Sequence, residues 1–216
     1  TRVAQGLSYF VRFLERFPDV NTLAIADENE VLKYWQGLGY YSRCKNMLQT
    51  AQIIVNVFHG SFPTTYEDII KLKGIGPYTA AAIASFAFDL PYAVVDGNVI
   101  RILSRYFGIE SPYQTSKEKK QFELLAQKLL PQKQSADYNQ AIMDLGATIC
   151  KPQNPLCENC PFTKNCYAYI NGRISELPVK KSKIVLKDRY FHFFIFENKQ
   201  SIFIQHRTEK DIWQHL

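Results

Sequence analysis

Leu72-Lys-Gly-Ile-Gly-Pro-Tyr-Thr-Ala80 lies between two segments with helical periodicity, and it decides the fold of the chain around it. Its two glycines permit a positive φ or a close approach of backbones, and Pro77 suits the first turn of a following helix. Backbone amides at a helix N-terminus bind anions, and Lys71 and Lys73 add positive charge. The stretch therefore predicts a phosphate-binding helix-hairpin-helix, with an ordinary interhelical turn as the alternative. The candidate DNA-binding residues of this hairpin are Lys73, Gly74, Ile75 and Gly76.

Apolar residues recur at intervals of three and four along most of the first 170 residues. This spacing is typical of amphipathic helices, and glycine or proline signals separate one helix from the next. Thr64 or Thr65, and Ser116, are the expected N-caps of two of these helices. We therefore predict a mostly α fold, with helices over residues 3–17, 28–35, 45–58, 64–72, 78–88, 98–107, 117–130 and 137–149.

The composition changes after residue 170. Residues 171–187 are polar and basic, which is typical of a linker. Arg189–Phe196 and Gln200–Arg207 are rich in aromatic and β-branched residues and flank a turn at 197–199, so two antiparallel strands are expected. Because a lone hairpin is marginal in water, residues 188–216 are expected to be the truncated start of a β-containing domain. The abrupt start and end of the sequence lead us to expect a fragment.

The overall composition limits the class of protein. The chain has 216 residues, of which 46% are hydrophobic, and this is enough for one or two packed domains. A formal net charge of +6 favours a polyanionic partner such as nucleic acid. The sequence has neither a signal peptide nor an apolar run of 18 residues. A membrane partner is therefore not expected, and the expected location is the cytoplasm.

Four cysteines follow the spacing C-x6-C-x2-C-x5-C within residues 150–166. Four thiolates that close on one point in a loop predict a metal site. An iron–sulfur cluster is favoured over zinc, because a structural zinc site usually pairs two C-x2-C knuckles and this loop has one. Zinc and disulfides stay open as alternatives, and the fifth cysteine, Cys44, is expected to be a buried apolar residue. The candidate ligands are Cys150, Cys157, Cys160 and Cys166.

Asp96 stands between an apolar run and a predicted helix, in the stretch Val94-Val-Asp-Gly-Asn-Val-Ile-Arg101. A helix N-cap is the common use of Asp at such a boundary. The functional alternative is a partly buried carboxylate that the helix N-terminus keeps ionised, and that stabilises a cationic sugar transition state. The spacing does not decide between the two.

Trp35-Gln-Gly-Leu-Gly-Tyr-Tyr-Ser-Arg43 combines glycines, aromatic residues and an arginine at the end of a predicted helix. An aromatic residue on a glycine turn can stack on bases or wedge between them. Core packing of both tyrosines is the alternative.

Taken in order, these motifs resemble the adenine DNA glycosylase (MutY) family over residues 1 to about 170. The resemblance rests on Gly37–Arg43, the hairpin, Val95–Val99, Asp144-Leu-Gly-Ala147 and the four cysteines. It implies the helix-hairpin-helix glycosylase fold, with two helical lobes and a [4Fe-4S] cluster loop, followed by the start of a Nudix-like domain. It also implies a monomer that excises adenine mispaired with 8-oxoguanine or guanine in double-stranded DNA.

Endonuclease III, a bifunctional pyrimidine glycosylase/lyase, is the close competitor within the same superfamily. It has a nucleophilic Lys where this chain has Tyr78, and Asp-Thr-His where this chain has Asp96-Gly-Asn98. Without that Lys, a Schiff-base lyase step has no obvious nucleophile. A monofunctional glycosylase is therefore favoured, and a non-enzymatic iron–sulfur DNA-binding module is the third alternative.

The resemblance implies catalytic roles for three residues and a place in the substrate pocket for two more. Asp96 is similar to the aspartate that stabilises the oxocarbenium-like species or adds to it. Tyr78 and Asn98 match residues that support the excised nucleotide and the reacting water. Gln140 and Met143 fall where the family lines its adenine pocket. The adenine must be flipped out of the base stack before any of these groups can act.

The resemblance also implies contacts around the opposing oxidised guanine. Thr1, Leu38 and Tyr40 align with residues of this kind, with Tyr40 as the wedge. The family's general acid is a glutamate in Ser-Glu-Val-Met-Leu-Gln-Gln-Thr, whose last residue aligns with Thr1. That glutamate would precede residue 1, and general-acid catalysis contributes about 10²–10⁴-fold. The polypeptide as given is therefore expected to be inactive, although its parent protein is expected to be an enzyme.

Overall fold

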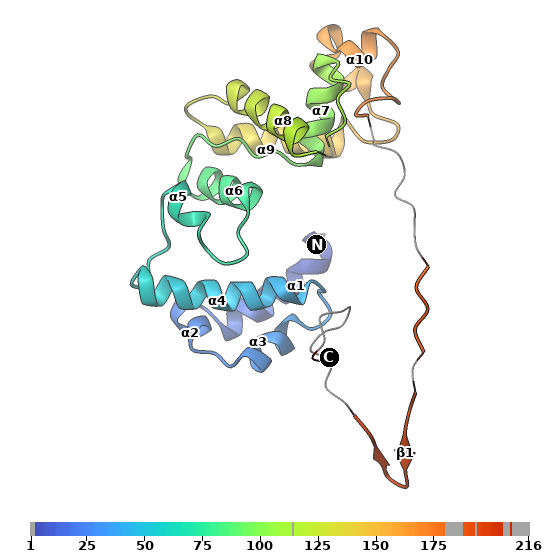
Figure 1. Ribbon diagram of the computed structural model, residues 1–216. Coiled ribbons are helices and arrows are strands. Elements are labelled where there is room, and N and C mark those ends of the chain that lie inside the picture. The colour runs from blue at the N-terminus through green and yellow to red at the C-terminus, as the bar shows by residue number, and fades with distance from the viewer. Residues whose placement is uncertain (1–2, 114, 180–187, 193, 205–207, 209–216) are drawn as a thin grey trace. The chain divides into compact units, whose positions relative to one another are not determined.

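The computed structural model describes residues 3–113, 115–179, 188–192, 194–204 and 208. The chain forms two compact units, residues 1–181 and residues 182–216. The first unit is helical, and the described part of the second contains one short hairpin (Figure 1). The predicted mostly α fold is confirmed. Among the described residues, the helices are too short or too polar to cross a membrane.

Four helices at the start of the first unit surround one apolar cluster. They are α1 (Val3–Arg16), α2 (Val20–Ala24), α3 (Glu28–Trp35) and α4 (Tyr41–Val57). Helix α4 lies against α2 and α3, and α1 lies against α3 (Figure 1). The buried members of the cluster are Phe17, Val31, Cys44 and Leu48, so the prediction that Cys44 is a buried apolar residue is confirmed.

The hairpin follows α4. Helix α5 (Tyr66–Ile69) packs on α6 (Pro77–Phe88) through the buried residues Ile69, Ala80 and Ala84. These small alanines allow the two helices to approach closely, and Ile75 in the turn packs against the same cluster. The side chain of Ile75 therefore anchors the turn to the two helices, while Gly74 and Gly76 are exposed.

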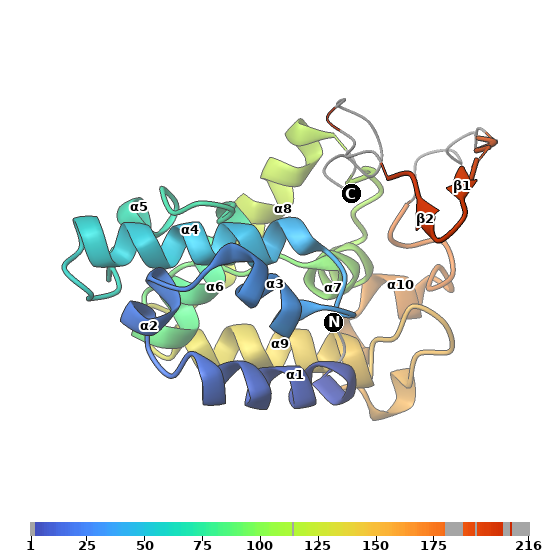
Figure 2. The same ribbon diagram turned by 90° about the horizontal axis from the view of Figure 1, so that it is seen from below.

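A third cluster holds the remaining helices together. It lies among α7 (Gly97–Phe107), α8 (Ser116–Leu129) and α9 (Ser135–Thr148), and its buried members are Val99, Ile100, Leu103, Phe122 and Ala126. Helix α9 contacts both α6 and α7, as Figures 1 and 2 show. The cysteine loop then forms two 3₁₀ turns, η1 (Cys157–Asn159) and η2 (Thr163–Asn165), and α10 (Tyr167–Ile170) packs on α7.

Several helix boundaries differ from the prediction. Helix α4 begins at Tyr41 rather than at residue 45, and α5 is one turn long rather than spanning residues 64–72. Thr65 caps α5 as expected, whereas α8 is capped by Thr115 and not by Ser116. Helices α2 and α10 were not predicted, because elements of four or five residues are too short to show a helical period.

In the second unit, β1 (Glu197–Asn198) pairs antiparallel with β2 (Ser201–Ile202). The predicted antiparallel hairpin is confirmed, but its strands are much shorter than predicted and its turn lies at Lys199-Gln200. Lys199 has φ +56°, which suits a two-residue turn. This turn lies closer to the C-terminus than the predicted turn at 197–199, so β1 occupies two residues that were expected to belong to the turn. Residues 205–207 of the predicted second strand lie outside the described residues.

Candidate functional site

The turn between α5 and α6 has the geometry of a helix-hairpin-helix. Gly74 has φ +76°, and a Cβ there would lie 2.5 Å from the side-chain nitrogen of Asn46 on α4. Gly76 is the N-cap of α6 and Pro77 its first residue, and no side chain caps the helix. The first amides of α6 are therefore free of a capping side chain, which is the arrangement that binds phosphate. Thr50 donates to the carbonyl of Lys73 at 3.0 Å and ties the turn to α4.

Two details of the hairpin correct the expectation. Gly76 has φ −94° and its Cβ would meet nothing within 4 Å, so the special backbone requirement applies to Gly74 alone. Lys71 forms an ion pair with Asp68 at 2.9 Å, which partly neutralises it, whereas Lys73 is exposed beside the turn. Lys73 is therefore the more available of the two cations.

The two glycines offer a matched test of the hairpin. Gly74→Ala should destabilise the protein by about 1–3 kcal/mol, because alanine is strained at this φ and its methyl group would collide with Asn46. Gly76→Ala adds the same methyl group in a permitted conformation and open space, so its effect should stay within about 1 kcal/mol. Urea unfolding of both variants measures the difference. Equal destabilisation would show that the hairpin does not depend on Gly74.

Asp96 is the N-cap of α7, and both of its carboxylate oxygens are held. Oδ1 accepts a hydrogen bond from the Val99 amide at 2.8 Å, and Oδ2 accepts one from the Asn98 side chain at 2.8 Å. Asp96 is partly buried and stands at the positive end of an eleven-residue helix. The cap expected as the common use of Asp is thus present. The same arrangement also fixes one negative charge in a defined direction, which a functional carboxylate requires.

Arg101 lies about one turn after Asn98 on α7 and holds the Asn98 side chain by a hydrogen bond. Its Nη2 atom donates to Asn98 Oδ1 at 2.8 Å and to the Gly146 carbonyl at 2.7 Å, and its Nε donates to the Cys150 carbonyl at 2.7 Å. Arg101 is only 7% exposed. Burial lowers the pKa of Arg101, while the thiolate charge of Cys150 acts in the opposite direction. A continuous set of hydrogen bonds therefore runs from the cysteine loop through Arg101 and Asn98 to Asp96.

Helix α9 borders this group. A Cβ at Gly146 would lie 2.5 Å from Cβ of Asn98, so the glycine allows α9 to approach α7 closely. Met143 packs against the apolar cluster that contains Val99, and Gln140 is exposed and donates to Asp144 at 2.9 Å. The structure thus brings the helix of Gln140 and Met143 against the helix that Asp96 caps.

The other predicted site residues lie apart from this network. Tyr78, on the first turn of α6, is 50% exposed, and within the described residues no hydrogen bond or ring contact joins it to Asp96. Tyr40 is 81% exposed in the left-handed conformation just before α4, with the Arg43 guanidinium 5.6 Å from its ring. Tyr41 is 45% exposed, so neither tyrosine of this turn is packed in the core. Leu38 is half-buried, and Thr1 lies outside the described residues.

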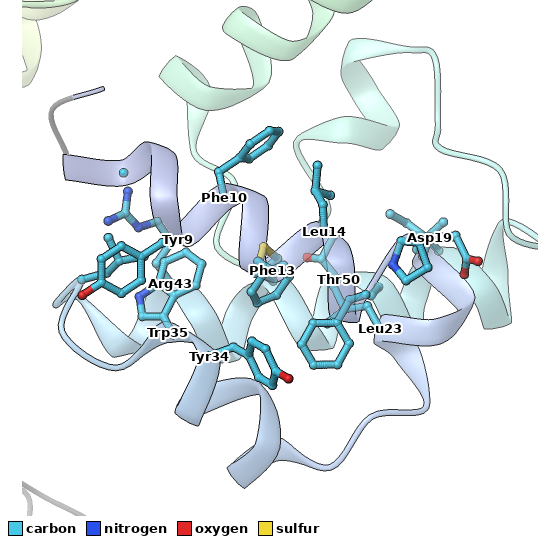
Figure 3. Close-up of a pocket in the computed structure, with 18 of the residues that line it drawn as sticks. Tyr9, Phe10, Phe13, Leu14, Asp19, Leu23, Tyr34, Trp35, Arg43 and Thr50 are labelled. Carbon is cyan, nitrogen blue, oxygen red and sulfur yellow. The ribbon is translucent and has the colours of Figure 1, made fainter. Parts of the chain in front are cut away.

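Residues of α1, α3 and α4 line a cavity of about 580 Å³ (Figure 3). Leu38 is also among the lining residues. Aromatic residues of α1 and α3 line it, among them Tyr9, Phe13 and Trp35, and Arg43 lies 5.6 Å from the Trp35 ring. Asp96, Asn98 and Tyr78 do not line it. The cavity is therefore separate from the candidate catalytic group.

The four predicted metal ligands are all half-buried, and two of them contact Arg105. Nη1 of Arg105 lies 3.4 Å from Sγ of Cys150, and Sγ of Cys166 lies 3.6 Å from the Arg105 carbonyl. Burial raises the pKa of Cys157, and negative charge on Cys150 and Cys166 raises it further. Both effects favour the neutral thiol form of Cys157.

The structure holds the cysteine loop through its backbone. Arg105, 3% exposed, donates to the carbonyls of Lys151 at 2.8 Å and Leu177 at 3.0 Å. The hydroxyl of Thr163 donates to the carbonyl of Cys160 at 2.8 Å, and also to that of Cys157. Across the described residues, no three or more His, Cys, Asp or Glu side chains are placed so that they could hold a metal ion. The four thiols have the donor chemistry of an all-thiolate metal centre. In this structure they are not arranged in a coordination geometry.

A known protein family matches more than half of the chain. Residues 1–132 match the family described as HhH-GPD superfamily base excision DNA repair protein. The chain belongs to this family. The hairpin at Gly74 and the Asp96 helix N-terminus both fall within the matched residues.

The sequence is similar to adenine DNA glycosylases of bacteria and animals. It is 38% identical to that of Buchnera aphidicola subsp. Schizaphis graminum over all of this chain and 62% of the relative. It is 43% identical to that of Rattus norvegicus over 82% of this chain and 35% of the relative. The resemblance inferred from the motifs is confirmed. The chain spans 62% of the length of the Buchnera relative, so activity and substrate are inferred below.

Solved structures of this superfamily have the same fold. A thermostable thymine-DNA glycosylase superposes with a TM-score of 0.72 at 29% identity, covering 79% of each chain. A non-covalent endonuclease III–DNA complex superposes with a TM-score of 0.67 at 22% identity, covering 79% of this chain and 78% of that one. The second likeness concerns the fold alone. Together they confirm the predicted helix-hairpin-helix glycosylase architecture.

Proposed function

We propose that the chain is a piece of an adenine DNA glycosylase that holds most of its glycosylase domain. The full-length enzyme would hydrolyse the N-glycosidic bond of adenine opposite 8-oxoguanine or guanine in duplex DNA. The observation that carries the proposal is the fixed carboxylate of Asp96 at the start of α7, held by the Val99 amide and by Asn98. As the bond between the sugar and adenine breaks, positive charge develops on the sugar. A negative charge already in place stabilises that transition state without reorganisation.

The remaining groups have supporting roles in this proposal. Asn98, itself held by Arg101, orients the carboxylate and the attacking water. Gln140 and Met143 on α9 line the pocket for the flipped adenine, and Tyr78 supports the excised nucleotide. Tyr78 also stands where a bifunctional relative would carry a nucleophilic Lys. The enzyme is therefore proposed to be monofunctional.

DNA binding is proposed to use two surfaces of the first unit. The free amides at the start of α6 and the exposed Lys73 would contact phosphates, together with Gly74, Ile75 and Gly76. The exposed ring of Tyr40 would wedge beside the opposing oxidised guanine. Leu38 and Thr1 are proposed to contact the same guanine. The net charge of +6 supports a polyanionic partner.

A [4Fe-4S] cluster is proposed on Cys150, Cys157, Cys160 and Cys166. Bound there, it would serve as a structural brace for the loop after α9. The proposal rests on the spacing of four thiols within one loop and on Arg105, whose positive charge lies beside Cys150. Lys151 and Lys164 would then lie on a basic surface that faces DNA phosphates.

Purified protein should contain iron and acid-labile sulfide, and Cys157→Ser should lose both, because one thiolate ligand is removed. Cys44→Ala removes a thiol that lies outside this set, so its iron content should be unchanged. Metal analysis and visible absorption measure the result. Colourless protein with stoichiometric zinc would overturn the assignment.

The domain organisation is part of the proposal. Residues 1–170 would form the glycosylase domain, 171–187 a linker, and 188–216 the start of a Nudix-like domain that helps to recognise the oxidised guanine. The short hairpin at 197–202 and the change to aromatic strand composition support that division. We propose that the protein acts as a monomer in the cytoplasm.

One assay tests the function. Full-length protein is incubated with duplex DNA that contains adenine opposite 8-oxoguanine, and strand breaks are read with and without alkali. Breaks that appear only after alkali are the expected result, because a monofunctional enzyme leaves an abasic site. Breaks without alkali would indicate a glycosylase/lyase. No breaks under either condition would leave a DNA-binding module.

A further inference from the structure

The segment between α6 and α7 is held by two side-chain carboxamides that come from different helices. Figure 1 shows this segment leaving α6 and running past α8 and α9 to α7. On one edge lies Gln127 of α8. Its Nε2 donates to the Pro91 carbonyl at 2.8 Å, and its Oε1 accepts from the Ala93 amide at 3.0 Å. A single side chain thus satisfies one backbone acceptor and one backbone donor.

Asn139 of α9 does the same for the intervening peptide groups. Its Nδ2 donates to the Tyr92 carbonyl at 2.9 Å, and its Oδ1 accepts from the Val94 amide at 3.0 Å. Nδ2 also donates to the Ser85 hydroxyl of α6 at 2.8 Å. Asn139 is 1% exposed, so each of these bonds is shielded from water.

The two sets of bonds alternate along the chain. Gln127 binds the backbone of residues 91 and 93, and Asn139 binds that of residues 92 and 94. In an extended chain, successive peptide groups point to opposite edges. The segment is therefore held on both edges, as a central strand is, with carboxamides in place of neighbouring strands.

The clamped segment leads directly into the candidate catalytic group. Val94 is two residues before Asp96, which caps α7. The Val99 amide belongs to the first turn of α7 and therefore has no acceptor within the helix. It donates to Asp96 Oδ1 instead, so hydrogen exchange at Val99 depends on whether the carboxylate stays in place. Only Val95 separates the clamped residues from Asp96.

We propose that Gln127 and Asn139 are positioning residues that fix the Asp96 carboxylate by clamping the backbone before it. Their effect on adenine excision rests on the function proposed above, whereas their effect on the backbone does not. Neither residue is proposed to contact the substrate. Gln127 is exposed and Asn139 is buried, so the clamp can be opened from the solvent side without a cavity in the core.

The first arm of the test is amide hydrogen exchange in the full-length protein with Gln127→Met. Methionine keeps the length of the side chain, carries no charge and removes both hydrogen bonds. Exchange at Ala93 and at Val99 should become faster by about fivefold or more. Gln121→Met, an exposed position on the same helix, is the matched control and should change neither. Faster exchange at Ala93 with no change at Val99 would overturn the proposal, because the clamp would then not reach Asp96.

The second arm measures single-turnover adenine excision and affinity for an uncleavable duplex. Gln127→Met should lower the excision rate by about threefold to tenfold with affinity unchanged, since only the placement of the carboxylate is altered. An unchanged rate in an active enzyme would overturn the positioning role. If the wild-type protein excised no adenine, the proposed function would fail, and the exchange arm would still decide the clamp.

Asn139→Asp provides a second variant from the buried edge. It keeps the acceptor for the Val94 amide but loses both donated bonds and places a carboxylate against the Tyr92 carbonyl. Its effects on exchange at Val99 and on excision should exceed those of Gln127→Met. Smaller effects on both in a folded variant would contradict the two-sided clamp, and if the variant does not fold, the Gln127 result decides.

Discussion

Replacing Asp96 with Asn in the full-length protein is expected to lower single-turnover adenine excision by about 100-fold or more, with affinity for lesion DNA largely unchanged. The change removes a negative charge at nearly constant shape. Contacts that bind the ground state survive, because the structure assigns Asp96 no role in the hairpin or in the Tyr40 turn. Stabilisation of the cationic sugar is lost, because a neutral amide cannot supply it.

The same variant separates the two roles of Asp96. Asn is about as good an N-cap as Asp, so the bond from the Val99 amide and the stability of α7 should persist. Thermal unfolding of Asp96→Asn measures the cap, and single-turnover kinetics measure the chemistry. Asp96→Ala is the comparison, and it should lose both. If Asp96→Asn kept more than about a tenth of the rate, a cost of about 1.4 kcal/mol or less, Asp96 would be a helix cap alone.

The sequence predicted those parts of the fold that depend on local signals. The hairpin at Gly74, the proline start of α6 and the position of Asp96 before α7 follow from residue types at fixed offsets. The long helices follow from apolar periodicity. The end of α5 and the bounds of β1 and β2 were predicted poorly, because they depend on where a turn closes rather than on periodicity.

The supporting residues of the site could not be predicted in the same way. Arg101 and Arg105 are four residues apart on α7, which places both on one face. The spacing does not show that this face is buried, since the loop that covers it comes some 50 residues later. Gln127 and Asn139 look like ordinary helical polar residues. Their partners are backbone groups, which carry no sequence signal.

Arg101→Met is expected to destabilise the protein by about 3–5 kcal/mol. Methionine fills much of the same space but donates no hydrogen bond. The carbonyls of Cys150 and Gly146 and the amide oxygen of Asn98 would then lose a charged donor in a site from which water is largely excluded. Urea unfolding measures the loss. Arg12→Met removes the same group from α1. There the described contacts are an exposed hydrogen bond of 3.4 Å to the Ser8 carbonyl and a guanidinium 4.8 Å from the Tyr9 ring, so the change should cost less than about 1 kcal/mol.

Arg101→Lys distinguishes charge from geometry in this network. Lysine restores the positive charge, but as a point donor it cannot reach Cys150, Gly146 and Asn98 together as the guanidinium does. We therefore expect partial recovery of stability and little recovery of excision. In the proposed mechanism, excision requires the hydrogen bond from Asn98 to Oδ2 of Asp96. The Asn98 side chain is in turn held by the hydrogen bond that the Arg101 guanidinium donates to it. If lysine fully restored both stability and excision, the positive charge alone would be sufficient to hold the cysteine loop and Asn98 in place. Recovery of neither would show that the direction of each hydrogen bond is what the buried arginine supplies.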